Sequence, residues 1–247
     1  STWSTQTLEE TIKDKYPDLK VLRTDAETVG DKERPEYKCF DNFNEFIDRE
    51  KPDILLVSPV LETGIDITSK HFDSYWGMNW GVTPVNSFSQ AMARIRAKIP
   101  RYIWSSNNFM GRVGNGSYFS SGLEYSQRRQ LKVNELIFQH FDSDFNPYIN
   151  DSCLKLWATR GAIVNTQGKQ LVKSVQRKFA EDYEVIEIDN VNLEQEEKQS
   201  IADRINDIKN LNIEKQYQEI INAPKVDDQT LDEMRKKKEK TSTERFI

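Results

Sequence analysis

A continuous apolar segment, DILLVSPV at residues 53–60, constrains the fold of this 247-residue chain more than any other feature. It is too short for a helix of ordinary length, and two prolines, Pro52 and Pro59, stand near its ends. Runs of this kind are typical of strands that are buried on both faces of a parallel sheet. We therefore expect an α/β fold in which residues 53–60 form a central strand.

The sequence around this strand alternates between helix and strand patterns. Further strands are expected at residues 20–23, 72–78 and 101–106, and helices at residues 5–16, 41–50 and 84–97. Strands that alternate with helices predict a parallel sheet with right-handed crossovers.

Beyond residue 107 the pattern becomes mostly helical. Helices are expected at residues 123–140, 152–181, 192–222 and 227–239, with a short strand candidate at 184–188. The sequence therefore predicts an α/β domain over residues 1–112 and a helical extension with long charged helices over residues 113–247.

Composition excludes several classes of protein. The net charge is -5, so any contact with DNA must come from a local patch of the surface. The chain has two cysteines and two histidines without metal-ligand spacing, which argues against a zinc site and favours a reducing compartment. No apolar run approaches the length of a membrane span, and no segment of this sequence has the pattern expected of a signal peptide. A cytoplasmic protein without a membrane partner is expected.

The strongest chemical signal is SPVLETGIDI at residues 58–67, where the buried strand ends in a turn. Ligands of open α/β sheets bind at the carboxyl ends of strands, and Gly64 would let the backbone approach a ligand closely. Ser58 and Thr63 could donate to phosphate oxygens, and Asp66 could accept from a ribose hydroxyl. An ordinary strand–turn–strand connection explains the pattern equally well.

A second signal lies in the helix expected after Pro84. Gln90 and Arg94 are four residues apart, so on a helix both would project from the same face. A guanidinium forks onto two oxygens, which suits recognition of a phosphate chain. The alternative is that Arg94 is a solvated helix residue. Arg96 would point elsewhere on the helix, as a cap or as one partner of a surface ion pair.

A loop rich in asparagine, glycine and serine follows at residues 107–117. Arg112 lies within it, among residues whose backbone N–H groups could face a phosphate. A flexible surface loop is an equally good interpretation. Most tryptophans are expected in the core or between helices, and Trp80 is the one candidate for stacking on a base.

SPVLETGIDI resembles motif V of superfamily-two helicases, and QAMARIR at residues 90–96 resembles motif VI. Three segments of the chain are similar in sequence to the cyanobacterial plasmid-replication helicases: HFDSYWGMNWGVTPVNSFSQAMARIR, VLRTDAET and LWATRGAIVNTQGKQ. The resemblance implies a RecA-like fold of the P-loop NTPase type, with a mostly parallel sheet flanked by helices. It departs from the usual motif VI at Ala93 and Ala97, where a glycine and an arginine are common.

The same resemblance implies roles for single residues. Arg94 would be the arginine finger that stabilises charge on the transferred phosphoryl group, and Arg96 would be a further candidate for a phosphate contact. Nucleotide contacts would also come from three other positions: Gly64, Asp66 and Gln90. From the resemblance, contacts with the DNA backbone would come from Ser4, Thr5 and Ser58. The residue chemistry described above adds Thr63 and Arg112 as further candidates for such contacts.

No G-x-x-x-x-G-K-[ST] loop occurs in this sequence, so the residues that grip ATP and Mg²⁺ are expected in a first RecA-like domain of a longer protein. The chain alone is expected to bind neither and not to hydrolyse ATP. Its partners would be that domain and single-stranded DNA. Two alternatives are a non-catalytic origin-DNA-binding or partner-docking module, and a nucleotide-binding α/β enzyme outside the helicases.

Overall fold

A computed structural model describes residues 2–58, 65–141, 150–188, 193–224 and 226–236. The chain divides into two compact units. The first unit comprises residues 1–73, 94–99 and 188–247, and the second comprises residues 74–93 and 100–187. Residue 112, where the sequence analysis places a boundary, lies within the second unit.

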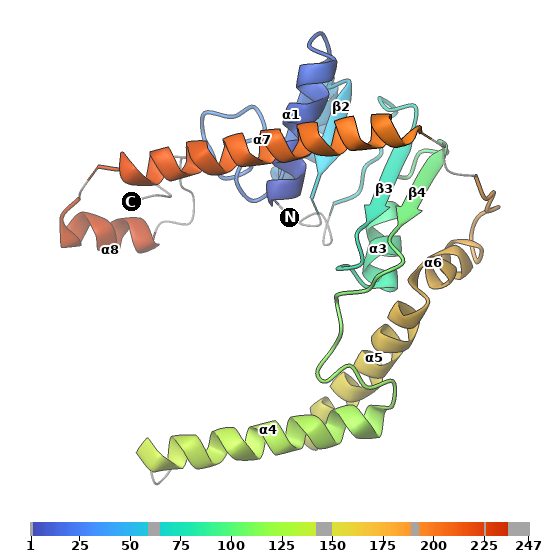
Figure 1. Ribbon diagram of the computed structural model, residues 1–247, viewed down its shortest axis with the longest axis vertical. Coiled ribbons are helices and arrows are strands. Elements are labelled where there is room, and N and C mark those ends of the chain that lie inside the picture. Colours follow the sequence, from blue (N-terminus) through green and yellow to red (C-terminus); the bar gives the residue numbers. More distant parts are fainter. Residues whose placement is uncertain (1, 59–64, 142–149, 189–192, 225, 237–247) are drawn as a thin grey trace. The chain divides into compact units, whose positions relative to one another are not determined.

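The first unit contains two strands, a 3₁₀ turn and four helices among its described residues (Figure 1). In chain order they are α1 (Thr2–Lys15), β1 (Val21–Thr24), η1 (Cys39–Asp41), α2 (Phe43–Glu50), β2 (Ile54–Val57), α7 (Gln195–Ile221) and α8 (Asp228–Lys236). Strands β1 and β2 pair in parallel, with Val21 opposite Ile54 and Thr24 opposite Val57. Helix α1 packs on β1, and α7 packs on α1.

The core of the first unit is built around α2. The side chain of Asn42 accepts a hydrogen bond from the backbone N–H of Glu45 and caps this helix. Spacing along the helix then places Phe43, Phe46 and Ile47 on one buried face. Apolar residues of β1 and of the two segments near residues 65–67 and 94–96 are buried in the same unit: Val21, Leu22, Ile65, Ile67 and Ile95.

The second unit contains two strands and four helices among its described residues. They are β3 (Tyr75–Asn79), α3 (Val85–Met92), β4 (Arg101–Ser105), α4 (Ser120–Phe141), α5 (Asp151–Lys169) and α6 (Leu171–Phe179). Strands β3 and β4 pair in parallel. One face of this sheet lies against a core formed by α3 and α6, whose buried residues are Val85, Phe88, Met92, Leu171, Val175 and Phe179.

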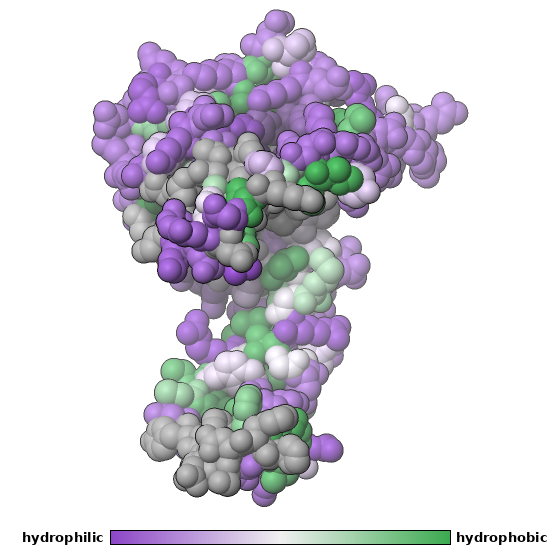
Figure 2. All heavy atoms as spheres, turned by 90° about the vertical axis from the view of Figure 1, so that its left-hand side faces the viewer, coloured by the Kyte–Doolittle hydropathy of each residue, from purple (hydrophilic) through white to green (hydrophobic). Residues whose placement is uncertain are grey.

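A smaller core joins α4 to α5 in the second unit. Leu123, Ala158 and Ala162 are buried there, with Trp157 packed against them. Further along α4 many apolar side chains remain exposed, and Figure 2 shows apolar surface around these helices. Among the described residues, therefore, other parts of the chain cover helix α4 at one of its ends and leave the rest of it exposed.

The predicted RecA-like fold is wrong. A RecA-like sheet needs a central strand that is buried on both faces and paired at both edges. Strand β2 instead extends only from Ile54 to Val57, is half-buried, and pairs with β1 alone among the described residues. The strands expected near residues 72–78 and 101–106 form a separate two-stranded sheet in the other unit. No extended parallel sheet is present in the described parts of the chain.

Several predicted elements differ in their ends. The helix expected at residues 84–97 stops at Met92, because the backbone around Ile95 is extended and pairs with Ile67. The helix expected at residues 152–181 is broken at Gln170 into α5 and α6. The strand candidate at residues 184–188 has no regular structure.

The two cysteines differ in environment and should differ in reactivity. Burial, reinforced by the nearby Glu36 carboxylate, raises the pKa of the Cys39 thiol to about 12, whereas Cys153 is exposed. Because the thiolate is the reactive form, Cys39 stays neutral and inert at pH 8. We expect a chromogenic disulfide reagent to label one thiol per native chain at pH 8 and two after unfolding. Rapid labelling of both thiols in the native protein would contradict this burial.

Candidate functional site

The ends of the two segments that resemble helicase motifs V and VI, residues 65–67 and 94–96, lie side by side in the first unit. The backbone N–H of Ile67 donates to the carbonyl of Arg94 at 2.8 Å, and the N–H of Arg96 donates to the carbonyl of Ile67 at 3.0 Å. This parallel bridge joins Ile67 and Ile95, whose side chains are both buried. The alternation of an extended chain then turns the neighbouring charged side chains away from the core.

Asp66 and Arg96 form an exposed ion pair on this bridge. The Nε of Arg96 lies 2.6 Å from Oδ1 of Asp66, and the two side chains are 63% and 51% exposed. An ion pair this exposed contributes about 1 kcal/mol or less to stability, so either group can exchange its partner for a ligand at little cost. The sequence analysis left the cap and surface-pair interpretations of Arg96 open, and the structure has a surface pair.

The turn that carries Asp66 is held by a residue that the sequence analysis missed. Asn44 on α2 donates through Nδ2 to the carbonyl of Asp66 at 2.9 Å. Its Oδ1 accepts from the backbone N–H groups of Thr68 and Ser69 at 2.8 and 3.0 Å. An asparagine in the first turn of a helix is a weak signal, because such residues usually act only on their own helix.

Arg94 lies beyond the end of α3 and not on it. Helix α3 stops at Met92, so Gln90 and Arg94 do not share a helix face, and the inference drawn from their spacing is wrong. Gln90 is an exposed residue of the second unit, and Arg94 is a half-buried residue of the first. The Asp66 carboxylate accepts a hydrogen bond from Arg96, which lies two residues after Arg94 in the sequence.

The remaining predicted contacts in the first unit are in different environments. Ser58 follows β2 and is buried; its N–H donates to the carbonyl of Thr24 at 3.1 Å, and its hydroxyl has no partner among the described residues. Thr5 on α1 donates to Oδ2 of Asp25 at 2.9 Å, and Ser4 is exposed. Thr63 and Gly64 lie outside the described residues.

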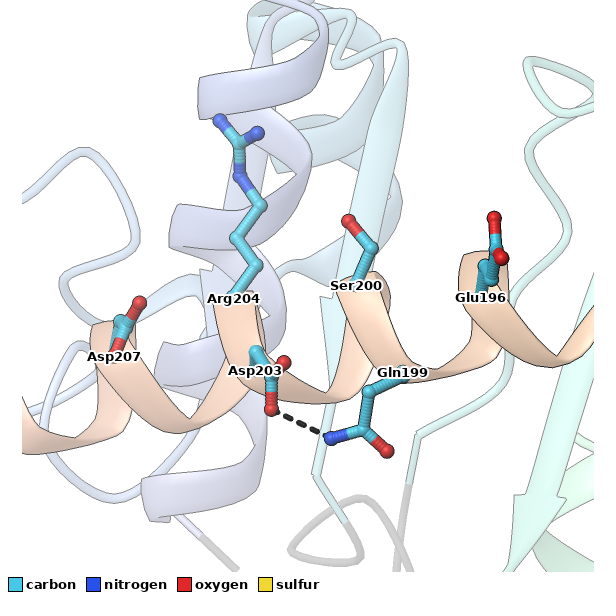
Figure 3. A pocket seen from close by; sticks show the side chains of 6 residues that line it. All are labelled: Glu196, Gln199, Ser200, Asp203, Arg204 and Asp207. Atoms are coloured by element: carbon cyan, nitrogen blue, oxygen red, sulfur yellow. Dashed lines mark hydrogen bonds between the residues drawn. The ribbon is translucent and has the colours of Figure 1, made fainter.

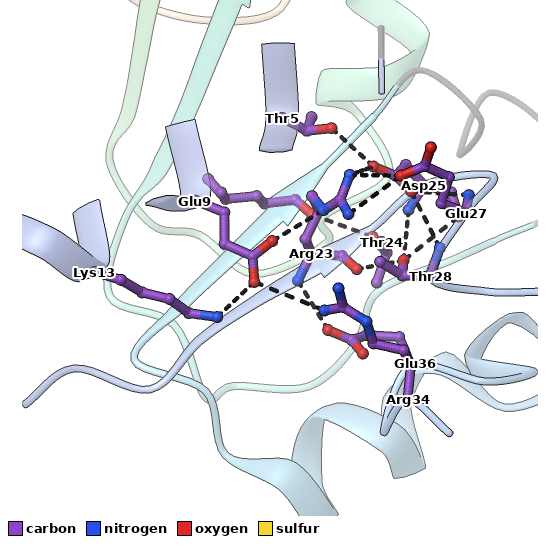
Figure 4. Close-up of polar contacts among 11 residues, drawn as sticks. Thr5, Glu9, Lys13, Arg23, Thr24, Asp25, Glu27, Thr28, Arg34 and Glu36 are labelled. Carbon is purple, nitrogen blue, oxygen red and sulfur yellow. Dashed lines mark hydrogen bonds and ion pairs between the residues drawn. The ribbon is translucent and has the colours of Figure 1, made fainter. Parts of the chain in front are cut away.

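A buried polar cluster lies where β1 ends, beside Thr5 (Figure 4). The guanidinium of Arg23 contacts Asp25 at 2.6 Å, Glu9 at 3.0 Å and the more exposed Glu27 at 3.4 Å. The backbone N–H of Arg23 donates to Oε1 of Glu36 at 3.1 Å.

The side chains of Arg23, Glu9, Asp25 and Glu36 in this cluster are nearly inaccessible to solvent. The sequence analysis did not assign these residues, although VLRTDAET carries part of the cluster. Buried charges are retained only when they are paired, and the guanidinium of Arg23 is the buried cation that Glu9 and Asp25 share.

Arg112 lies in the second unit, in the loop between β4 and α4. It is exposed and makes no ion pair with the described residues. The loop around it is fastened to α5 by the buried Asn165, whose Oδ1 accepts from the N–H of Val113 at 2.8 Å. Its Nδ2 donates to the carbonyls of Val113 and Ser117 at 3.1 and 2.8 Å. The loop is therefore held by side-chain hydrogen bonds.

An open depression runs along α7, with Gln199 donating to Asp203 at 2.8 Å (Figure 3). It is lined by residues of that helix alone: Glu196, Gln199, Ser200, Asp203, Arg204 and Asp207.

Among the described residues, no group of three or more histidine, cysteine or acidic side chains is placed to hold a metal ion. The described helices are all too short or too polar to cross a membrane.

Comparisons with known proteins give no function. No protein-family model matches the chain. An uncharacterized protein of Picosynechococcus sp. is 41% identical over 144 residues, which are 57% of this chain and 14% of the relative. The chain therefore matches only a small part of that longer protein. No solved structure matches the chain.

Proposed function

We propose that this chain is part of an ATP-dependent DNA helicase that acts in plasmid replication, where it supplies an arginine to the nucleotide and contacts the DNA backbone. The observation that carries the proposal is the backbone pairing of residues 65–67 with residues 94–96. Segments that resemble motifs V and VI must lie together to act on one nucleotide.

The chemistry would use the exposed guanidinium of Arg96 and the neighbouring Arg94. Guanidinium groups stay charged and bind two phosphate oxygens at once. Asp66 holds the guanidinium of Arg96 on the surface until a phosphate takes the place of the Asp66 carboxylate. ATP and Mg²⁺ would be held by another domain of the longer protein, and the chain alone would hydrolyse no ATP. Two unpaired cysteines fit the cytoplasm, where such an enzyme would work.

The test is ATP hydrolysis by the full-length protein in the presence of single-stranded DNA. For Arg94→Ala we expect turnover to fall at least about tenfold, because an arginine finger acts on charge that develops in the transition state. DNA affinity should stay within about twofold of the wild type. Arg49→Ala is the matched control, since Arg49 is an exposed arginine of the first unit that pairs with Glu50.

A second candidate is a non-catalytic origin-DNA-binding or partner-docking module. It is favoured by the division of the described strands into two separate pairs, which leaves no continuous sheet against which a second motor domain would close. This candidate predicts that Arg94→Ala changes neither ATP turnover nor DNA affinity. Normal turnover in Arg94→Ala would therefore reject the motor function and favour the module.

A further inference from the structure

The exposed face of the β3–β4 sheet is aromatic. The register places Trp76 opposite Tyr102 and Met78 opposite Trp104. These side chains are 63%, 37%, 49% and 43% exposed, while the opposite face lies on the core of α3 and α6. Trp80, in the turn after β3, is exposed as well. We call these five residues the aromatic face.

The rings of the aromatic face are arranged in pairs. Trp76 and Tyr102 stack at 4.3 Å between centroids with 18° between their planes, and Trp80 and Trp104 lie 4.7 Å apart at 59°. The expectation that most tryptophans lie in the core is wrong for Trp76 and Trp104. Exposed apolar clusters of this kind mark binding sites, and flat aromatic surfaces suit ligands that are themselves flat.

Charge around the aromatic face favours an anionic partner. From Ser74 to Leu123 the sequence has no Asp or Glu, although the whole chain has 40 of them. The stretch contains both strands and the loop that carries Arg112. That loop is hydrogen-bonded to the turn of Trp80, since the N–H of Met110 donates to the carbonyl of Gly81 at 2.7 Å. Arg112, an exposed cation with no acidic partner in the described parts of the chain, therefore lies in the loop that adjoins the aromatic face.

We propose that the aromatic face binds single-stranded DNA by stacking of its bases, with Arg112 on the phosphates; this rests on the proposed function. Flat rings provide stacking for any base, and a basic surface attracts the backbone, which together define non-specific single-strand binding. The aromatic face is then a DNA site separate from the phosphate contacts of the first unit.

The chemistry of stacking selects a single strand over a duplex. A base can stack on an aromatic side chain only with a face that is not already stacked on a neighbouring base. Bases bound to the aromatic face must therefore leave their own stack. A duplex resists such unstacking, whereas a single strand extends easily.

The test is tryptophan fluorescence of the 247-residue chain titrated with an oligothymidylate, and separately with a duplex of equal length. We expect the oligothymidylate to quench the fluorescence and to bind more tightly than the duplex. Trp76→Ala and Trp104→Ala, followed by fluorescence anisotropy of a labelled oligothymidylate, should each raise the dissociation constant about tenfold. Trp76→Phe should restore most of the affinity, because a ring remains.

The control is Tyr125→Ala, which removes an exposed aromatic side chain from α4 in the same unit. Its affinity should equal that of the wild type. Far-ultraviolet circular dichroism and the urea midpoint of each variant establish that it is folded. Unchanged affinity for the oligothymidylate in folded Trp76→Ala and Trp104→Ala would overturn the proposal. If those variants instead altered the oligomeric state in size-exclusion chromatography with affinity intact, the face would be a protein interface.

The two proposals fail in different ways. If full-length Arg94→Ala lost ATP turnover while the tryptophan variants still bound the single strand, the motor function would stand and the stacking site would be rejected. Normal turnover in Arg94→Ala, with tryptophan variants that lose the single strand, would retain the stacking site alone.

Discussion

Replacing Arg23 with methionine is expected to lower the free energy of unfolding by about 3–5 kcal/mol. Arg23 is buried and contacts the buried carboxylates of Glu9 and Asp25. Methionine fills much of the same space but carries no charge. Asp25 would then remain buried without the cation that it contacts, whereas Glu9 would keep its ion pair with the half-exposed Lys13. Removing one partner of a buried ion pair costs far more than the pair itself contributes, because the remaining charge has lost its water.

Urea unfolding followed by circular dichroism measures this loss. Arg34→Met is the matched control, because Arg34 reaches the same Glu9 at 4.0 Å but its side chain is 41% exposed. Exposed pairs contribute about 0–1 kcal/mol, so this variant should unfold near the wild-type midpoint. If Arg23→Met and Arg34→Met were equally stable, the carboxylates around Arg23 would have to be solvated.

The second large effect is expected for Gly81→Ala, in the turn that joins the aromatic face to the loop of Arg112. Gly81 has a φ of +84°, and a Cβ atom there would lie 1.8 Å from the carbonyl oxygen of Asn108. The alanine variant would combine an unfavourable backbone conformation with a collision against backbone. We expect a loss of about 2–4 kcal/mol in the stability of the second unit.

Comparison with Gly116→Ala separates the cost of the backbone conformation from the cost of the collision. Gly116 also has a positive φ, +78°, but the nearest atom to its Cβ would be the flexible side chain of Arg112 at 3.4 Å. Only the backbone cost remains, about 1–2 kcal/mol. Thermal unfolding of both variants gives the comparison. Equal melting temperatures would mean that the turn of Gly81 can move away from Asn108.

Local structure was largely predictable from the sequence. Strand β4 begins at Arg101 as expected after Pro100, and α2 ends at Glu50 as expected. These elements depend on their own residues: prolines that stop helices, caps that start them, and apolar spacing along one face. The break at Gln170 was missed because the flanking sequence keeps a helical pattern across it.

The arrangement of the strands could not be derived in this way. In DILLVSPV, at residues 53–60, an apolar run predicts burial but does not say which strands pair with it. In β3 and β4 alternation gives the wrong face, because the large apolar side chains lie on the exposed side of the sheet: Trp76, Met78, Tyr102 and Trp104. Trp76 and Trp104 fall on the exposed side only because Tyr75 and Ile103 pack on the core.

The candidate site was predictable in part for the same reason. The surface pair of Arg96 is one of the two interpretations that the sequence allowed. The partner of Asp66 does not follow from short sequence patterns, because it depends on where α3 ends. That end is set by the pairing of Ile67 with Ile95, a contact between residues far apart in the chain. A continuous helical pattern through Arg94 contains no sign of it.

The path of the chain between the units restricts how such a protein can be rearranged. Strands β3 and β4 reach the second unit in separate passes, with residues 94–99 returning to the first unit between them. The second unit is therefore not one uninterrupted stretch of sequence, and a segment cut at residues 74 and 187 would carry residues 94–99 of the first unit with it. Excision of that segment would remove Ile95 from the first unit, and with it the backbone partner of Ile67.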